Sequence, residues 1–456
     1  MDFVHRQRRG AELFLLVLAL AVGIGAYAAV GFGMEGEIPV NLVAYGGWLT
    51  GLIVAAHVCV RIFAPYADPV LLPVVAALNG LGLAVIHRLD ITYEALDRPN
   101  HTFATQQLTW MTLGVLLFVA TLVVIRDHRI LQRYTYTSAL VAVVLLVMPF
   151  LPVIGVENHG ARIWVRFFGV GMQPGEVAKV LLVIAFAGYL VQHRDALALA
   201  GRRVLFIDLP RARDLGPILI MFGVSMMILV AQRDLGSSLL FFGLFLIMLY
   251  VATERPGWLV VGTVLFAGGA AAAYKLFGHV RSRFDVWLDP LGNYQDRGYQ
   301  LVEGFFGMAW GGLIGRGFGN GHPERIIFAE SDFIIAAIGE ELGLTAVMAI
   351  LLCYGLIVER ALRIALISRD GFGKLMALGL AAVFALQVFV VVGGVTGLIP
   401  LTGLTTPFLS YGGSSLVANW VIIALLMRIS DQARRPTPQL QVTSEDSEST
   451  QVVKLR

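Results

Sequence analysis

Charged residues are scarce in this sequence. Asp, Glu, Lys and Arg make up only 14% of the 456 residues, whereas apolar residues make up 57%. Soluble domains carry about 25% charged residues, so the composition excludes an ordinary soluble enzyme or binding module. The net charge of +3 is too small to indicate nucleic acid as a partner.

Cysteine is scarcer still. The two cysteines, Cys59 and Cys353, lie far apart, and each falls within an apolar run. A disulfide framework needs several cysteines at short spacings, so none is predicted. Both side chains are expected to pack as small apolar groups.

Apolar runs of about twenty residues take the place of the missing polar sequence, and each is long enough to cross a bilayer as a helix. We therefore predict an all-α polytopic membrane protein, a bundle of about 12 transmembrane helices. The predicted spans lie near residues 13–32, 44–63, 70–87, 108–125, 138–155, 177–191, 215–231, 236–253, 257–277, 333–357, 374–399 and 414–429.

Arginine and lysine orient these spans. They gather at the N-terminus, in the even-numbered connections and after the last span, which predicts cytoplasmic N- and C-termini. The basic loop from Arg194 to Arg213 is expected to be solvated and to touch anionic membrane lipids, although it is long enough to dock a partner. The tail 431–456 is polar and is predicted to be disordered.

The connection 278–332 falls on the opposite, extracytoplasmic side. It is the longest polar stretch between spans and the predicted working site, because its composition suits an anionic or sugar-bearing group at a membrane surface. Its charged and aromatic residues include Arg281, Arg283, Asp285, Trp287, Asp289, Asp296 and Arg297.

A second polar group precedes the span at 177–191. Pro174 suits the first turn of a helix, and Glu176 suits the positive end of its dipole. Lys179 follows three residues later on the same face, so the two form either a helix-start ion pair or part of a site. In the second case, Lys179 and Arg162 would neutralise a diphosphate.

Two further motifs carry acids at the ends of spans. Asp234 lies in a tight turn beside Arg233, where local pairing and helix capping is the favoured interpretation. Asp332 is a candidate helix cap. Glu340 and Glu341 lie about two turns into a span, where an unpaired carboxylate is costly, so we expect a cationic partner, Lys179 or Arg233.

The connection 400–413 is rich in hydroxyls, prolines and glycines and includes Ser410, with Ser414 just after it. Non-helical backbone at this depth must pack on protein or line a polar cavity. The stretch is therefore either a re-entrant structural loop or a sugar- or phosphate-binding loop.

Five ordered motifs resemble the signatures of the SEDS family, the RodA/FtsW proteins of bacterial elongation and division. They are QPGEVAK, RDLGSS, WLDP followed by GYQ, SDFIIAAIGEELG and PLTGLTTPFLSYGGSS. The resemblance covers about residues 70–430, which implies a ten-helix core that includes the outer loop 278–332. Residues 1–69 would add a cytoplasmic segment and two more helices, an arrangement similar to members from high-GC Gram-positive bacteria.

The resemblance implies a peptidoglycan glycosyltransferase in the bacterial cytoplasmic membrane. Such an enzyme polymerises lipid II into glycan strands at the outer face, releases undecaprenyl diphosphate and works with a class B penicillin-binding protein. A carboxylate must accept the proton of the attacking hydroxyl, and cations must stabilise the leaving diphosphate. A divalent cation, Mg²⁺ or Mn²⁺, remains open, because the sequence contains no ligand cluster for it.

The family's motifs map onto this chain residue by residue. Arg162 and Lys179 would contact the diphosphate, and Glu340 or Glu341 would be an internal partner that shapes the cavity. The remaining matched positions are Glu176, Asp234, Asp332, Ser410 and Ser414.

The chain departs from the family at the expected catalytic base, an Asp between the LDP-like motif and Gly-Tyr-Gln. Counting without a gap from Asp289 places Asn293 at that position, and Asn cannot take the proton. Asp296 is the favoured base, because it lies nearest Gly298-Tyr299-Gln300, and Asp289 is the second candidate. With Pro290, Asp289 alternatively forms only a turn.

Two other functions remain open. A flippase for lipid-linked precursors would need polar groups that continue across the membrane, whereas the acids and cations here gather at the outer ends of spans. A non-catalytic scaffold for a class B penicillin-binding protein would explain Asn293 as a lost base.

Overall fold

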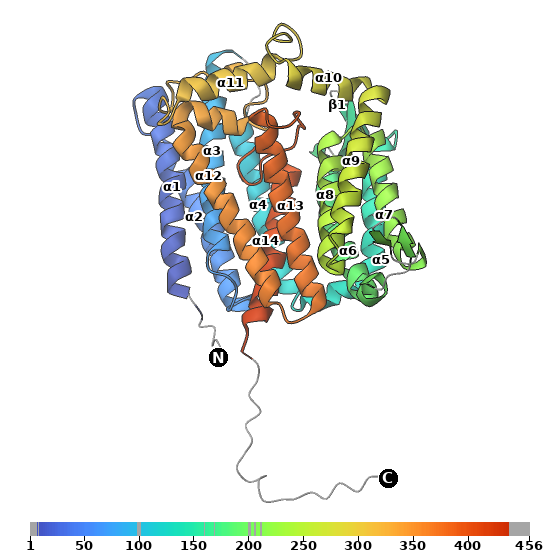
Figure 1. Cartoon of the computed structure of the whole chain (residues 1–456). Helices are drawn as coiled ribbons and strands as arrows, with labels where there is room; N and C mark the ends of the chain where they lie inside the picture. The colour runs from blue at the N-terminus through green and yellow to red at the C-terminus, as the bar shows by residue number, and fades with distance from the viewer. Residues whose placement is uncertain are drawn as a thin grey trace, which may run out of the picture.

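The computed structural model describes residues 7, 9–97, 102–158, 160–167, 169–198, 202–204, 207–209 and 212–436. Within this part of the chain the fold is a bundle of long helices (Figure 1). The helices are α1 (Arg9–Glu35), α2 (Leu42–Phe63), α3 (Leu71–Ala95), α4 (Phe103–Val124), α5 (Thr135–Val147), α6 (Pro174–Ala198), α7 (Ala212–Ala231), α8 (Leu235–Thr253), α9 (Gly257–Leu276), α10 (Gly278–Leu288), α11 (Tyr299–Gly311), α12 (Ile334–Ile367), α13 (Gly371–Val395) and α14 (Gly413–Arg434).

Eleven of the described helical segments are long and apolar enough to cross a bilayer, and one of them joins α5 to the 3-10 helices η1 (His128–Tyr134) and η2 (Met148–Phe150). A shorter apolar segment of α7, Gly216–Ala231, corresponds to the remaining predicted span. The predicted all-α polytopic fold is confirmed. The inner helices are α3, α6, α13 and α14, whereas α9 is almost entirely exposed.

Several predicted boundaries were wrong. The third span continues to Ala95, so residues 88–95 belong to a helix and not to a connection. The fifth ends at Phe150, and the residues after it form an antiparallel sheet of β1 (Gly155–Asn158), β2 (Ala161–Phe167) and β3 (Val170–Met172). A second, two-stranded sheet pairs β4 (Arg202–Val204) with β5 (Ile207–Leu209) in the basic loop.

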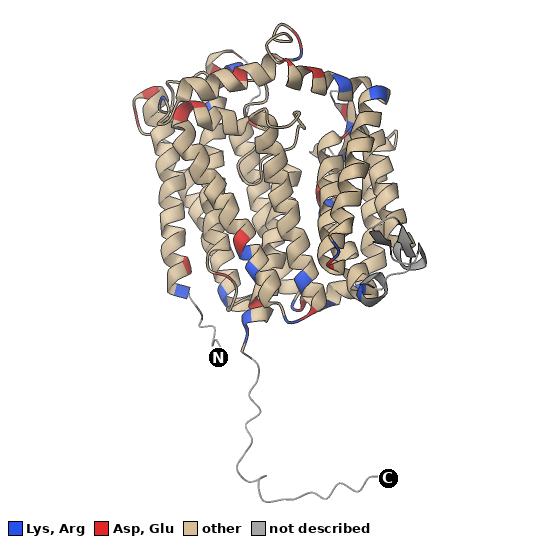
Figure 2. Cartoon of the chain, in the orientation of Figure 1, with Lys and Arg blue, Asp and Glu red and all other residues tan. Residues whose placement is uncertain are grey.

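The outer loop contains two helices that were not predicted from the sequence. Figure 1 shows α10 and α11 lying across one end of the bundle, with the loop between them rising above it. α1 begins and α14 ends at the opposite end. Figure 2 shows that charged residues gather at the two ends, with few along the middle of the helices.

α12 is interrupted at Gly343, whose φ of 78° is unfavourable for any residue with a side chain. At this break, residues 312–317 of the outer loop pack against the helix and bond to its backbone. The amides of Gly317 and Leu344 bond across it, to the carbonyls of Glu341 at 2.8 Å and Gly312 at 2.9 Å. These bonds replace the missing helical ones, which is the condition for irregular backbone at the depth of a span.

The two N-terminal helices pack on the rest of the bundle. α1 crosses α3 at Gly23 and Gly80, where a Cβ added to Gly23 would lie 2.9 Å from the Cα of Gly80. Gly33 lies against the outer loop, since a Cβ there would lie 2.2 Å from the carbonyl oxygen of Phe318. α1 therefore contacts the outer loop directly after the segment that packs against the break in α12.

The disordered tail was predicted to begin at residue 431, but residues 431–434 belong to α14. α14 continues to Arg434, because Asp431 is fully buried and accepts a hydrogen bond from the amide of Tyr66 at 2.9 Å. Arg434 also pairs with the buried Asp68 at 2.5 Å. The tail beyond residue 436 lies outside the described residues.

Candidate active site

A buried ion pair lies in the first turns of α6. Nζ of Lys179 lies 2.5 Å from Oε2 of Glu176, and both side chains are less than a tenth exposed. The same ammonium donates to Oε1 of Gln387 on α13 at 2.9 Å. We call Glu176, Lys179 and Gln387 the Lys179 cluster. The ion pair that was one of the two alternatives is present within α6. The charge-assisted hydrogen bond from Lys179 to Gln387 joins α6 to α13.

A second group, the Arg283 cluster, comprises Asp234, Arg283 and Asp332. Burial lowers the pKa of Arg283, and the charges of Asp234 and Asp332 oppose that change. Burial raises the pKa of Asp332 to about 6, although a hydrogen bond from Ser331 and the charge of Arg283 favour its ionised form. Asp332 does not cap α12, whose N-cap is Phe333. Its carboxylate is therefore available for another role.

Asp234 caps α8, as the sequence favoured, because its carboxylate accepts from the amide of Ser237 at 2.9 Å. Burial raises its pKa, while Ser237 and Arg283 lower it. Arg233 does not complete the expected local pair and instead donates to the carbonyl of Gly160 at 3.5 Å.

The connection between α13 and α14 joins the two clusters. The guanidinium of Arg283 donates to the carbonyls of Leu401 at 3.0 Å and Thr402 at 2.9 Å, and the amide of Gln387 donates to the carbonyl of Thr405 at 2.9 Å. Both clusters therefore share one wall, at the end of the bundle covered by α10 and α11.

Ser410 and Ser414 hold this connection in place. Oγ of Ser410 donates to the carbonyl of Ser331 at 2.6 Å and accepts from the amide of Thr406 at 2.9 Å. Oγ of Ser414 accepts from the amide of Gln173 at 2.9 Å. These bonds fit the structural alternative for both hydroxyls.

Glu340 and Glu341 lie apart from the Lys179 cluster, and the expected partners of Glu341 were wrong. Oε1 of Glu341 lies 2.6 Å from Nε of Arg88 on α3. Oε1 of Glu340 accepts from the amide of His322 at 2.6 Å. The adjacent glutamates therefore hold the outer loop where it enters the break in α12, and Arg88 supplies the charge that one buried carboxylate needs.

Arg162 lies on β2 at the surface, where its Nε donates to Oε2 of Glu157 at 2.8 Å and more than half of its side chain is exposed. Its amide bonds to the carbonyl of Gln232 at 3.2 Å, beside the turn that holds Asp234. The structure thus places Arg162 near the N-terminus of α8, with its guanidinium paired with Glu157 and not with the Lys179 cluster.

Both candidate bases lie in the loop between α10 and α11. Asp289 is exposed and closes a turn by accepting from the amide of Gly292 at 2.9 Å. Asp296 has a side chain that is 81% exposed, with Nε of Arg297 at 3.7 Å. Asp289 therefore has the geometry expected if it only forms a turn. The carboxylate of Asp296 is exposed, so a substrate could reach it.

Three functional candidates were not predicted from the sequence as individual sites. Arg283 had been noted only as part of a polar loop. Arg88 and Gln387 are polar residues in apolar helices. Burying a polar side chain within a membrane span is energetically costly, so their presence there is the sequence signal that could have identified them.

Within the described part of the chain, no group of three His, Cys, Asp or Glu side chains could hold a metal ion. Mg²⁺ often takes one or two carboxylates and completes its shell with water and substrate phosphate. Asp234 and Asp332 are suitable carboxylates for that arrangement, although Arg283 already supplies them with positive charge.

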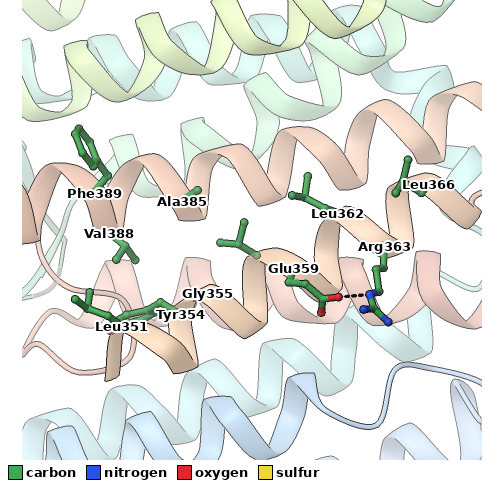
Figure 3. Close-up of a pocket in the computed structure, with 11 residues that line it drawn as sticks. Leu351, Tyr354, Gly355, Glu359, Leu362, Arg363, Leu366, Ala385, Val388 and Phe389 are labelled. Atoms are coloured by element: carbon green, nitrogen blue, oxygen red, sulfur yellow. Dashed lines mark ion pairs between the residues drawn. The ribbon is translucent and has the colours of Figure 1, made fainter. Parts of the chain in front are cut away.

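A separate groove of about 540 Å³ lies between α12 and α13 (Figure 3). Its walls are mostly apolar, and Glu359 and Arg363 pair toward one end of it. Leu366 and Phe389, which also line it, are more than half exposed. The groove faces the surroundings of the bundle and shares no lining residue with the two polar clusters.

Comparison with known proteins shows what the chain is similar to. The family model FTSW_RODA_SPOVE, described as cell cycle protein, matches residues 69–435. The chain is 48% identical over 430 residues to "Peptidoglycan glycosyltransferase RodA" of Mycobacterium leprae, covering 94% of this chain and 92% of that protein. It is 30% identical over 370 residues to "Probable peptidoglycan glycosyltransferase FtsW" of Geobacter metallireducens, covering 80% and 95%.

A solved structure has the same fold. It is described as "Structural coordination of polymerization and crosslinking by a peptidoglycan synthase complex", and one of its chains superimposes with a TM-score of 0.64 at 26% identity. The superposition covers 80% of this chain and 98% of the other. α1 and α2 precede the residues that the family model matches.

Proposed function

The chain belongs to the FtsW, RodA and SpoVE family of cell cycle proteins, and from this premise we propose that it is a peptidoglycan glycosyltransferase that polymerises lipid II. The observation that carries the proposal is the 48% identity to a peptidoglycan glycosyltransferase RodA across 94% of the chain. The products would be glycan strands and undecaprenyl diphosphate, made for cell elongation or division.

The polar clusters suit the charge that this reaction develops. The leaving diphosphate needs cations in a site that excludes water. Lys179 is buried and Arg283 is half-buried. Lys179 would contact the diphosphate, and Arg162 would do so after its guanidinium leaves Glu157. Glu176 and Gln387 hold Lys179 in place. The carbonyls of Leu401 and Thr402 hold Arg283, and the charges of Asp234 and Asp332 favour its ionised form.

We assign the general base to Asp296, with Asp289 as the second candidate. A general base must reach the proton that it removes. Asp296 is exposed on the loop that rises above the end of the bundle (Figure 1), whereas Asp289 already accepts a hydrogen bond within its turn. Asp332, whose pKa burial raises to about 6, is a third acid that the geometry adds, since a base works best with a pKa near the working pH.

A divalent cation, Mg²⁺ or Mn²⁺, is also proposed to bind beside the diphosphate. When bound, it would neutralise part of the diphosphate's charge. Its ligands would be Asp234 or Asp332 together with substrate oxygens. Activity should fall in chelator and return with added Mg²⁺ or Mn²⁺, and the thermal midpoint of the protein with lipid II should rise when the cation is added.

The end covered by α10 and α11 is proposed to lie outside the cytoplasm, with both termini inside. The opposite end of the bundle carries Arg126, Arg129, Arg360 and Arg369, whose accumulation at connections marks a cytoplasmic face. Cysteine labelling of Asp296→Cys in whole cells by a membrane-impermeant thiol reagent tests this orientation.

The partner proposed for this chain is a class B penicillin-binding protein. The solved structure of similar fold is described as a peptidoglycan synthase complex that coordinates polymerisation with crosslinking. The groove between α12 and α13 (Figure 3) is apolar and open to the surroundings of the bundle, so it suits a single membrane-spanning helix of that partner. Co-purification of the partner with Leu362→Trp and Phe389→Trp tests this surface, because both substitutions would fill the groove.

Polymerisation by the purified chain in proteoliposomes tests the function. Lipid II and the cognate penicillin-binding protein are added, and the product is resolved as a ladder of glycan strands. A ladder supports the enzyme. If lipid II instead crosses the bilayer without polymerising, the chain is a flippase. Partner binding with neither activity would identify a scaffold.

A further inference from the structure

A polar cavity lies beside α11 and shares no lining residue with the Lys179 and Arg283 clusters. Its volume is about 750 Å³, which is within the range of ligand-binding pockets. α11 supplies one wall, and residues between Asn320 and Ile326 together with Glu340 of α12 supply the other. The cavity is lined by Tyr294, Glu303, Phe306, Gly307, Ala309, Trp310, Asn320, His322, Arg325, Ile326 and Glu340. The mechanism proposed above uses none of these residues.

One face of α11 carries the side chains that a sugar would meet. Glu303, Phe306 and Trp310 follow one another at helical spacing and so lie on the same side. Phe306 and Trp310 are both more than half exposed. Arg316 stacks over the Trp310 ring at 4.0 Å and bonds to its carbonyl at 2.7 Å, which fixes the position of this exposed residue.

Polar groups face these rings from the other wall. Glu340 is 4% exposed and is held by the amide of His322. The amide side chain of Asn320 donates to the carbonyl of Arg316 at 3.2 Å and leaves its oxygen as an acceptor. Aromatic faces beside carboxylate and amide oxygens match a ligand with apolar ring faces and many hydroxyl donors.

The charge of the cavity argues against a diphosphate. Glu303 and Glu340 contribute two carboxylates, against one arginine, Arg325. The two carboxylates would repel the negative charges of a diphosphate bound in the same cavity. An uncharged polyol avoids that repulsion and donates hydrogen bonds to both carboxylates.

The cavity also adjoins the loop with the candidate bases. The hydroxyl of Tyr294, two residues before Asp296, donates to Oε1 of Glu303 at 2.7 Å. A polysaccharide bound along α11 would therefore have one end next to the loop where the proposed transfer occurs. We propose that this cavity is a saccharide-binding groove that retains the growing glycan strand between additions, an inference that rests on the proposed function.

The test uses the full chain in detergent and a soluble tetramer of N-acetylglucosamine. Saturation-transfer NMR measures binding to wild type, Trp310→Ala, Glu303→Gln and the matched control Trp48→Ala. Trp48 is also about half exposed but lies on α2. We expect both groove variants to weaken binding roughly tenfold, and the control to bind like wild type.

A second readout is the length of the glycan strands at equal consumption of lipid II. Both groove variants should make shorter strands, and Trp48→Ala should not. Unchanged strand length and unchanged tetramer binding in both groove variants would overturn the proposal, and would leave Trp310 as an interfacial anchor only. Glu303→Gln preserves the shape of the side chain, so it remains informative if Trp310→Ala does not fold.

The two proposals fail in different ways. If wild type makes no glycan but binds the tetramer through Trp310, the polymerase proposal fails and the groove stands. If wild type makes glycan but binds no tetramer, and strand length is the same in every variant, the groove proposal fails alone.

Discussion

Replacing Asp332 by Asn should change how the stability of the protein depends on pH. Burial raises the pKa of Asp332 from 3.8 to about 6. Each unit of pKa corresponds to about 1.4 kcal/mol, so ionised Asp332 would cost the folded state on the order of 3 kcal/mol above pH 6. Below pH 4 the protonated group costs nothing. Wild type should therefore lose this amount of stability relative to Asp332→Asn as pH rises from about 4 to about 6.

The assay is thermal unfolding of both proteins in the same detergent between pH 4 and 8. Asp289→Asn serves as the control, because its carboxylate is exposed and closes a turn. The difference between wild type and Asp332→Asn should grow through pH 5 and then level off. A difference that does not change with pH would refute the reasoning, because it would mean that Asp332 is not a buried acid with a raised pKa. If Asp332 must be ionised for catalysis, wild-type activity should also rise through about pH 6.

Three further perturbations test the packing of the site. Lys179→Met should destabilise the protein by about 3–5 kcal/mol, because it leaves Glu176 buried without a partner; the double variant with Glu176→Gln should recover the thermal midpoint but not polymerisation. Arg88→Met should destabilise the protein by a similar amount, because it leaves Glu341 buried without a partner, and limited proteolysis should then cleave the outer loop earlier. Adding Glu341→Gln should reverse both effects. Gly33→Val should lower polymerisation severalfold by displacing the outer loop, with little change in purification yield; normal activity would show that α1 does not support that loop.

The sequence was sufficient to predict the spans, because a run of apolar residues that crosses a bilayer must form a helix whatever its neighbours are. It also placed Glu176 and Lys179 on one face of a helix, with an ion pair as one of two alternatives, since three-residue spacing brings side chains together within one helix. Both depend only on local geometry.

Contacts between distant segments could not be predicted in the same way. Glu341 and Arg88 are far apart in the sequence, and nothing local favours Arg88 over Lys179 as the partner. The helices α10 and α11 were missed because they lie across the end of the bundle and do not span it. The sheet formed by β1, β2 and β3 was missed because its strands are short and directly follow the apolar run of the fifth predicted span.

The site was predicted in its parts but not in its arrangement. Asp332 was identified as a candidate cap, yet its neighbours make it a buried acid. Ser410 and Ser414 were identified as candidate substrate contacts, whereas each hydroxyl bonds to backbone. Such outcomes depend on which groups the tertiary fold brings to the same place.

The most direct test of the central claim is lipid II polymerisation by wild type, Asp296→Asn and Asp289→Asn, each purified with the same penicillin-binding protein. The expected result is a glycan ladder from wild type, loss of the ladder in Asp296→Asn with the complex intact, and a ladder from Asp289→Asn. A wild-type complex that makes no glycan would contradict the account and favour the flippase or scaffold, with Asn293 marking a lost base. A full ladder from Asp296→Asn would show instead that another acid, such as Asp332, accepts the proton.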